Sequence, residues 1–171
     1  MIETERLTIR RIRFDDWQAI QAIWAEVAQT EFAQYDRPFN TDDEFVMERV
    51  EKWASFSDST EHMFFAVYLE KTVIGYIVLN QRENGYEIGY CFHPVYHGQG
   101  YARESISALL KVLKEQGVLY IIAGTALKNT PSVNLMHSLG FKLVATEKVS
   151  FYKDSKGEDI VFDGGIFELK L

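Results

Sequence analysis

The sequence contains few of the residues that cross-link a chain or bind metals. Only one of its 171 residues is cysteine, Cys91, and this excludes an internal disulfide. A single cysteine is typical of a reducing compartment, so we expect a cytoplasmic protein. The four histidines are scattered and show no metal-ligand spacing with Cys91, so we expect no bound metal.

Long apolar runs and an excess of positive charge are also missing. No apolar run approaches the length of a membrane span, and residues 1–5 lack the basic and apolar regions of a signal peptide. We therefore expect no membrane partner. The net charge of −7 argues against binding to nucleic acid, which needs a basic surface. It is compatible with a cationic partner such as an amine or a basic protein tail, although solubility is the commoner reason for moderate acidity.

The chain does contain the strands and helices of one globular domain. Its length and its apolar content of 47% predict a single domain over residues 1–171. Residue patterns predict helices at 15–27, 41–53, 101–116 and 130–139, and strands at 7–10, 64–69, 73–79, 86–92, 119–124, 143–153 and 160–171. The nearly all-apolar strand 119–124 is typical of burial on both faces. The fold class that follows is α/β, with a mixed sheet flanked by helices.

The most informative stretch is residues 86–105, which reads as a strand, a glycine-rich loop and the first turn of a helix. Gly98 and Gly100 remove side chains where the backbone must curl tightly. Their N–H groups, with those of Tyr101 and Ala102, can converge at a helix N-terminus, where the macrodipole favours negative charge. This arrangement predicts a site for a phosphate or diphosphate.

A glycine pair alone is more often only a turn. It is not a P-loop, because no Gly-Lys-Ser/Thr sequence follows it. It is also a poor dinucleotide fingerprint, because Glu104 stands in place of the third glycine. The phosphate interpretation therefore depends on a second motif further along the chain.

That second motif is Asn129-Thr-Pro-Ser-Val-Asn-Leu-Met-His-Ser-Leu-Gly-Phe141. It resembles the pattern Asn-x-x-Ala/Ser-x-x-Leu-Tyr-x-x-x-Gly-Phe of the GNAT N-acetyltransferase superfamily. The loop His97-Gly-Gln-Gly-Tyr-Ala102 resembles the acetyl-CoA diphosphate loop of the same family, Gln/Arg-x-x-Gly-x-Gly/Ala. With Glu87-Ile-Gly-Tyr90, the likeness is closest to the branch that includes the ribosomal-protein N-terminal acetyltransferases. The order of predicted elements extends the likeness over nearly the whole chain.

The resemblance implies a fold and a reaction. The fold would be an α/β (α+β) GNAT-like domain with a mixed, mostly antiparallel central sheet of about six to seven strands. A V-shaped splay would separate the fourth and fifth strands, 86–92 and 119–124, and hold the pantetheine arm. Acetyl-CoA would be the acetyl donor, with no metal, and the acetyl group would pass directly to a primary amine in a ternary complex. A homodimer is compatible with the family.

The resemblance also implies a set of cofactor-binding residues. Backbone N–H groups near Cys91 and Phe92 are candidates to stabilise the developing oxyanion. His97 departs from the usual Gln or Arg and is expected to contribute its backbone, with its ring on the surface. Arg103 is expected either to pair with a phosphate or to form a surface salt bridge with an acid such as Glu104. The full set is Cys91, Phe92, His93, His97, Gly98, Gln99, Gly100, Tyr101, Ala102, Arg103, Asn129 and Asn134.

Two residues are candidates for proton transfer. Glu87 lies where the family has a recurring base, although strand alternation alone would also place a solvent-facing glutamate there. The tyrosine that protonates the leaving thiolate in many members is replaced by Met136, which cannot donate a proton. Ser132 or a water is the substitute candidate, and His137 is expected to point elsewhere. Cys91 has no evident base partner and is expected to be a buried small residue rather than a nucleophile.

The acceptor pocket is expected to be built by the first two helices, their connection and the final hairpin. Glu31, Phe32, Tyr35 and Asp36 offer an aromatic and acidic lining suited to a cationic amine, although these aromatics could equally be core and these acids solvated. The leading acceptor is a protein N-terminal amine of the ribosomal-protein type. The alternatives are a small amine, either a polyamine or an aminoglycoside, and a non-catalytic acyl-CoA-binding module prompted by Met136.

Overall fold

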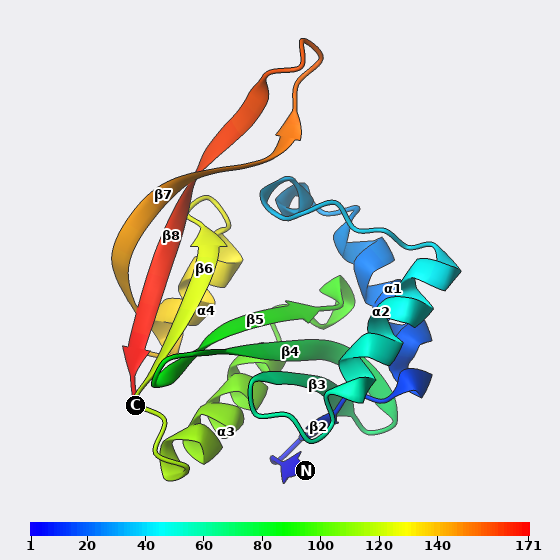
Figure 1. Cartoon of the computed structure of the whole chain (residues 1–171), viewed down its shortest axis with the longest axis vertical. Coiled ribbons are helices and arrows are strands. Elements are labelled where there is room, and N and C mark those ends of the chain that lie inside the picture. The colour runs from blue at the N-terminus through cyan, green and yellow to red at the C-terminus, as the bar shows by residue number, and fades with distance from the viewer.

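One eight-stranded sheet organises the molecule, in the order β1-β2-β3-β4-β5-β6-β8-β7 (Figure 1). The computed structural model describes residues 1–171. The strands are β1 Ile2–Glu3, β2 Leu7–Arg11, β3 His62–Leu69, β4 Thr72–Arg82, β5 Gly85–Phe92, β6 Tyr120–Ala126, β7 Lys142–Lys153 and β8 Asp159–Lys170. The helices are α1 Trp17–Val27, α2 Asp43–Ser55, α3 Tyr101–Glu115 and α4 Thr130–Ser138, with 3-10 turns at Phe14–Asp16, Glu31–Tyr35 and Pro94–Tyr96.

The predicted fold class is confirmed. All seven predicted strands form, and the two-residue β1 is added at the edge. Only β5 and β6 run parallel, so the sheet is mixed and mostly antiparallel. None of the four α-helices has the length and apolar composition that crossing a membrane requires.

Each face of the sheet has its own core. On one face, the apolar positions of α3, Ile106 and Leu109 among them, pack on strand residues such as Ile77. On the other face, α1 and α2 bury Ile20 and Val46 together with residues of β3 and β4. The helix positions recur every three or four residues, which is why each helix buries one stripe. Both cores hold β4 and β5 firmly in the middle of the molecule.

The splay between β5 and β6 is confirmed. The two strands pair only at Gly85 with Tyr120, Tyr86 with Ile121 and Glu87 with Ile122. Beyond these pairs β5 stays with β4, whereas β6 turns away with β8 (Figure 1). The N–H of His93 donates to the carbonyl of Ile74 on β4 at 2.9 Å. Because backbone groups alternate in direction along a strand, the N–H and C=O groups of Tyr90 and Phe92 face the opening of the V.

The prediction that the strand at 119–124 is buried on both faces is wrong. In β6, Ile121, Ala123 and Ala126 are buried, whereas the other residues are half-buried or, at Gly124, exposed. Residues 124–126 border the large cavity that lies in the opening of the V. An apolar run therefore marks the wall of a cleft here rather than the centre of a sheet.

The last two strands form a long hairpin that projects beyond the body of the domain (Figure 1). It reaches back to the 3-10 turn Glu31–Tyr35, where the Tyr152 hydroxyl donates to the carbonyl of Ala33 at 3.3 Å. The rings of Tyr35 and Phe162 meet edge to face, with centroids 5.4 Å apart. Segments distant in the sequence are thus joined on the open side of the V.

Candidate functional site

A single large cavity of about 960 Å³ runs from the glycine loop, through the V, to the hairpin. Its loop end is formed by Gly98 and residues 100–103, and its hairpin end by residues of the 3-10 turn Glu31–Tyr35, of Asp36 and of β7 and β8. The volume is at the upper end of the range for small-molecule sites. The cavity can therefore hold a large ligand together with a second, smaller molecule.

The loop end presents an uncapped helix N-terminus. Gly100 is the N-cap of α3, in the left-handed region at φ +82°, and no side chain caps the helix. By contrast, side chains of Asp42 and Asn129 cap α2 and α4. The first N–H groups of a helix need partners from outside the helix, and an anion is the partner that the macrodipole favours. The phosphate site predicted from the glycines thus has the required geometry.

The structure brings most of the predicted cofactor residues to one wall. Cys91, Phe92, His97, Gly98, Gly100, Tyr101, Ala102, Arg103 and Asn129 line the cavity, whereas His93, Gln99 and Asn134 do not. The His93 ring instead accepts the N–H of Val95 at 3.3 Å and caps a short turn. The Gln99 side chain donates to the carbonyl of Val95 at 3.1 Å. His97 is exposed, as expected, and its ring Nε2 lies 2.8 Å from the carbonyl oxygen of Phe92.

Arg103 lies at the loop end without a carboxylate partner. The alternative of a salt bridge between Arg103 and Glu104 is wrong, because Glu104 pairs with Arg6 at 2.6 Å. No ion pair involves Arg103, so its guanidinium is free to meet an anion. Arg6 was missed in the sequence because its contacts lie more than 90 residues away along the chain.

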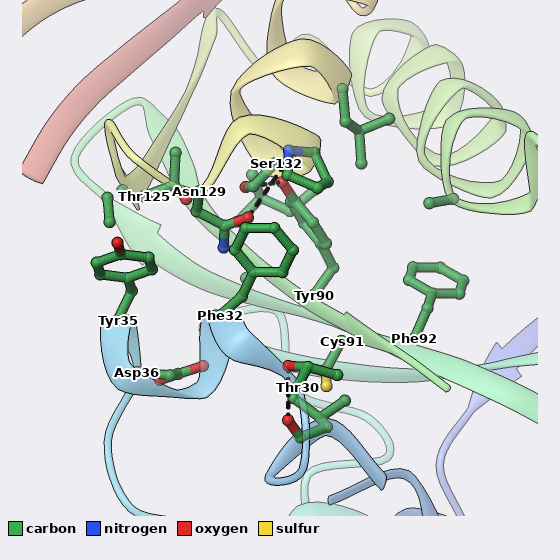
Figure 2. A pocket seen from close by; sticks show the side chains of 18 of the residues that line it. Thr30, Phe32, Tyr35, Asp36, Tyr90, Cys91, Phe92, Thr125, Asn129 and Ser132 are labelled. Carbon is green, nitrogen blue, oxygen red and sulfur yellow. Dashed lines mark hydrogen bonds between the residues drawn. The ribbon is translucent and has the colours of Figure 1, made fainter. Parts of the chain in front are cut away.

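A pair of hydroxyls faces the middle of the cavity. The Tyr90 hydroxyl, on β5, lies 2.7 Å from Ser132 Oγ, on α4 (Figure 2). Two hydroxyls that share one hydrogen bond keep one O–H free, and both residues line the cavity. Burial raises the pKa of Tyr90 to about 12, so the pair stays protonated. Met136 is fully buried and therefore neither donates a proton nor reaches the ligand.

The hairpin end is acidic and aromatic. Phe32, Tyr35 and Asp36 line it as predicted, whereas Glu31 is exposed and lies outside the cavity. The predicted contribution of the final hairpin comes from alternate residues of β7, which the sequence did not single out: Glu147, Val149 and Phe151. No lysine or arginine lines this end of the cavity, although the Arg37 guanidinium lies next to it, 5.3 Å from the centroid of the Phe151 ring. This end therefore favours a cationic group over an anionic one.

Asp36 is the carboxylate with the most perturbed environment in the cavity. Its side chain keeps accessible surface because the cavity is open, yet the surrounding wall removes enough water to raise its pKa. The N–H of Arg37, at 2.8 Å, and the charge of Arg37 offset only part of this effect. The charge of Asp36 also contributes to the raised pKa of the Cys91 thiol, so the carboxylate acts on the middle of β5. Figure 2 shows both side chains on the same side of the pocket.

Cys91 has the environment of a structural thiol. Burial raises its pKa to about 12, with a further contribution from the charge of Asp36. The hydroxyl of Tyr76 is its hydrogen-bond partner and is itself held by the indole N–H of Trp24 at 2.9 Å. A thiol with such a raised pKa remains protonated and is a poor nucleophile.

The structure does not bring Glu87 into the cavity. Its carboxylate forms an ion pair with Arg82 at the closed end of the V, where β5 is still paired with β6. Glu87 shares the face of β5 with Cys91 but lies four residues before it. A base must reach the proton that it removes, so this position does not favour Glu87 as a direct base, and its action through a water stays a prediction.

The cavity fits a long ligand with a diphosphate. The uncapped N-terminus of α3 and Arg103 are suited to phosphates, and the N–H and C=O of Tyr90 and the N–H of Phe92, which face the opening of the V, are suited to an amide-containing arm. These are the requirements of coenzyme A. The hairpin end then remains available for a second molecule beyond the thiol.

Comparisons with known proteins agree with this geometry. The family profile described as acetyltransferase (GNAT) domain matches residues 6–142. The chain is 31% identical over 144 residues to the uncharacterized N-acetyltransferase YnaD of Bacillus subtilis, covering 82% of each protein. It is 28% identical over 117 residues to the L-methionine sulfoximine/L-methionine sulfone acetyltransferase of Salmonella typhimurium, covering 57% of this chain and 68% of that protein. The solved structure of RimL, a ribosomal L7/L12 α-N-protein acetyltransferase in complex with coenzyme A, has a TM-score of 0.82 at 16% identity, covering 98% of this chain and 96% of that chain.

Proposed function

Because this chain belongs to the GNAT acetyltransferase family, we propose that its acceptor is the α-amine at the N-terminus of a protein. The chain is an N-acetyltransferase that uses acetyl-CoA. The observation that supports a protein N-terminus is the lining of the hairpin end, which includes Asp36 and Glu147 but no lysine or arginine, while Arg37 lies outside the lining against the Phe151 ring. A peptide N-terminus carries an amine without a neighbouring carboxylate, whereas the carboxylate of a free amino acid would face two like charges. The lone cysteine supports the cytoplasmic location that belongs to this proposal.

The residues of the cavity have separate tasks in this reaction. Acetyl-CoA supplies the acetyl group as a thioester. Asp36 takes the proton from the ammonium group, which is necessary because an α-amine has a pKa of about 7.7–8.0 and attacks only when neutral. The carbon–nitrogen bond forms and the carbon–sulfur bond breaks, and coenzyme A leaves as a thiolate, which would accept a hydrogen bond from the free O–H of the Tyr90–Ser132 pair and then take a proton from solvent. The protonated thiol of Cys91 takes no covalent part.

The experiment is a panel of acceptors with release of free thiol as the measurement. The panel contains peptides with free N-termini, the same peptides with acetylated N-termini, polyamines, aminoglycosides and free amino acids. We expect turnover with free peptide N-termini and none with the blocked peptides. Turnover with only small amines would overturn the protein N-terminus as acceptor. Binding of coenzyme A without any turnover across the panel would favour a non-catalytic module.

A small cationic amine is the second candidate acceptor. The aromatic rings at the hairpin end, Tyr35, Phe151 and Phe162, surround the acids and suit a compact cation. One relative is named for action on small amino-acid derivatives. A polyamine or an aminoglycoside would meet the same carboxylates without bringing a negative charge. The relative kcat/KM values in the panel separate the two candidates.

Removing the hydroxyl pair is expected to slow turnover without weakening cofactor binding. Ser132→Ala and Tyr90→Phe should each lower kcat by about tenfold, because the departing sulfur loses one hydrogen bond of roughly 1.5 kcal/mol. The double variant should lose little more than either single one, since one hydroxyl orients the O–H of the other and the two act as a unit. Ser138→Ala, on the exposed face of the same helix, is the matched control and should keep wild-type kcat. Additive losses would contradict action as a pair.

A further inference from the structure

An acidic residue, Glu104, lies close to the helix N-terminus at which the diphosphate is expected to bind. Glu104 is in the first turn of α3, four residues after the N-cap Gly100. A carboxylate at this position stabilises the helix itself. It also repels phosphate groups at the same N-terminus, because like charges a few ångströms apart cost free energy. Such an acid needs a counter-charge if the site is to bind an anion.

The structure supplies that counter-charge from the N-terminal segment. Arg6 Nη2 lies 2.6 Å from Glu104 Oε2, and Arg6 Nε donates to the same oxygen at 2.7 Å. The other oxygen accepts the Thr4 hydroxyl at 2.6 Å and the Arg6 N–H at 3.1 Å. Desolvation acts to raise the pKa of Glu104, but the hydrogen bonds from Thr4 and Arg6 outweigh it and lower the pKa. Glu104 is therefore ionised and its charge is matched by one guanidinium.

The same guanidinium also touches the glycine loop. Arg6 Nη1 donates to the carbonyl of Gln99 at 3.1 Å, and the guanidinium lies 4.4 Å from the centroid of the Tyr101 ring. A Cβ on Gly100 would lie 3.5 Å from Arg6 Nη2. Arg6 is thus adjacent to three successive residues, two of which contribute N–H groups at the start of α3. The Arg6 guanidinium therefore holds the loop through its contacts and neutralises the charge of Glu104 beside it.

We propose that Arg6 is a positioning residue of the coenzyme A site, which neutralises Glu104 and holds the loop 99–101 in its anion-binding conformation. Thr4 and the backbone of Arg6 fix the carboxylate, and the carboxylate in turn fixes the guanidinium. This inference concerns binding of the nucleotide and does not depend on which amine is acetylated. It makes the segment 4–6, at the start of the chain, part of a site otherwise built from residues after 88.

Calorimetric titration with coenzyme A tests the proposal through a double-mutant cycle. We expect Arg6→Ala to raise Kd by about tenfold, the effect of one lost charge-assisted interaction of about 1.4 kcal/mol. In Glu104→Gln, Kd should stay within about threefold of the wild-type value. This substitution removes the charge that repels the phosphates, and it also removes the main ion-pair partner of Arg6. The double variant should bind more tightly than Arg6→Ala alone, since no uncompensated acid remains. Arg6→Lys should recover part of the loss through its charge.

Salt and kinetics provide readouts that a purely structural contact would not move. The loss in Arg6→Ala should shrink at high ionic strength, because repulsion by Glu104 is then screened. KM for acetyl-CoA should rise while kcat and KM for the amine stay unchanged. Lys153→Ala, which removes an exposed ion pair at the hairpin tip, is the matched control and should bind like wild type.

Each alternative result has a definite meaning. Unchanged affinity in Arg6→Ala would overturn the proposal. The proposal would also be overturned if Arg6→Ala raised Kd by the same factor in the Glu104→Gln background and at high salt, because Glu104 would then play no part. Failure of wild-type protein to bind coenzyme A would instead refute the assignment of the loop, and failure of the acceptor panel would refute only the proposed acceptor.

Discussion

Replacing Gly100 with valine is expected to weaken binding of coenzyme A by about a hundredfold or more. Gly100 has φ +82° at the N-cap of α3, a conformation that costs an L-residue roughly 1–2 kcal/mol and a β-branched one more. Relief of this strain would rotate the peptide and move the N–H groups of residues 101–103 away from their common focus. Two lost hydrogen bonds to a charged group, at about 1.5–3 kcal/mol each, account for the expected factor. Isothermal titration with coenzyme A measures it.

Gly117→Val is the matched control for this variant. Gly117 follows the other end of α3 with the same φ of +82° and has open space around it. Both variants should lose comparable stability, measured as Tm, but only Gly100→Val should lose affinity. Wild-type affinity in Gly100→Val would show that the diphosphate does not bind at this helix N-terminus.

Replacing Asp36 with asparagine is expected to lower kcat/KM by about 10² to 10³, within the range for loss of a general base. Asparagine keeps the size and polarity of the side chain but accepts no proton at neutral pH. Cofactor affinity should stay unchanged, because Asp36 lies at the hairpin end and not at the glycine loop. Measurement of kcat/KM for the best acceptor of the panel, together with Kd for coenzyme A, separates the two effects.

The pH profile gives an independent test of Asp36. Burial raises its pKa above the ordinary carboxyl value, so wild-type activity should fall on the acid side at a pH above that value. This acid limb should disappear in Asp36→Asn. A raised pKa also means that the folded state loses stability as pH rises through it, so Asp36→Asn should be no less stable than wild type at neutral pH. Its loss of activity would then not reflect unfolding.

Glu87→Gln is the companion to Asp36→Asn. Glu87 is paired with Arg82 outside the cavity, so this variant should keep activity near that of wild type. A large loss in Glu87→Gln with a normal rate in Asp36→Asn would return the role of base to Glu87. Losses in both would indicate a proton path that connects the closed end of the V with the hairpin end.

The features that the sequence predicted well are the local ones. Positive φ angles occur at glycines that lie in the glycine loop or just after a helix, namely Gly98, Gly100, Gly117 and Gly140. The buried face of α3 could be predicted from the sequence because a helix buries residues at a fixed spacing. The splay of the V came from resemblance alone, since no pattern in β5 or β6 states where pairing stops.

The features that were missed depend on contacts between distant segments. Glu87 and Asp36 are both polar residues beside aromatics, and only the fold decides which of them faces the cavity. Glu147 and Phe151 belong to an edge strand whose position relative to residues 31–36 follows from the hairpin. Arg6 has no local signature, because an arginine after an exposed turn is usually solvated. Met136 shows the converse, since the sequence alone showed that it cannot donate a proton, whereas only the structure shows that it is fully buried.

The unequal construction of the two cavity ends has a consequence for how such enzymes diversify. The loop end consists of Gly98 and residues 100–103, a single short stretch of the chain. The hairpin end is assembled from segments 30–36 and 147–165, which meet through aromatic contacts and the Tyr152 hydroxyl. Insertions or exchanges in those two segments can recruit a new acceptor while the machinery for handling the thioester stays intact. With the loop end kept and the hairpin end exchanged, the same scaffold can serve unrelated physiological tasks.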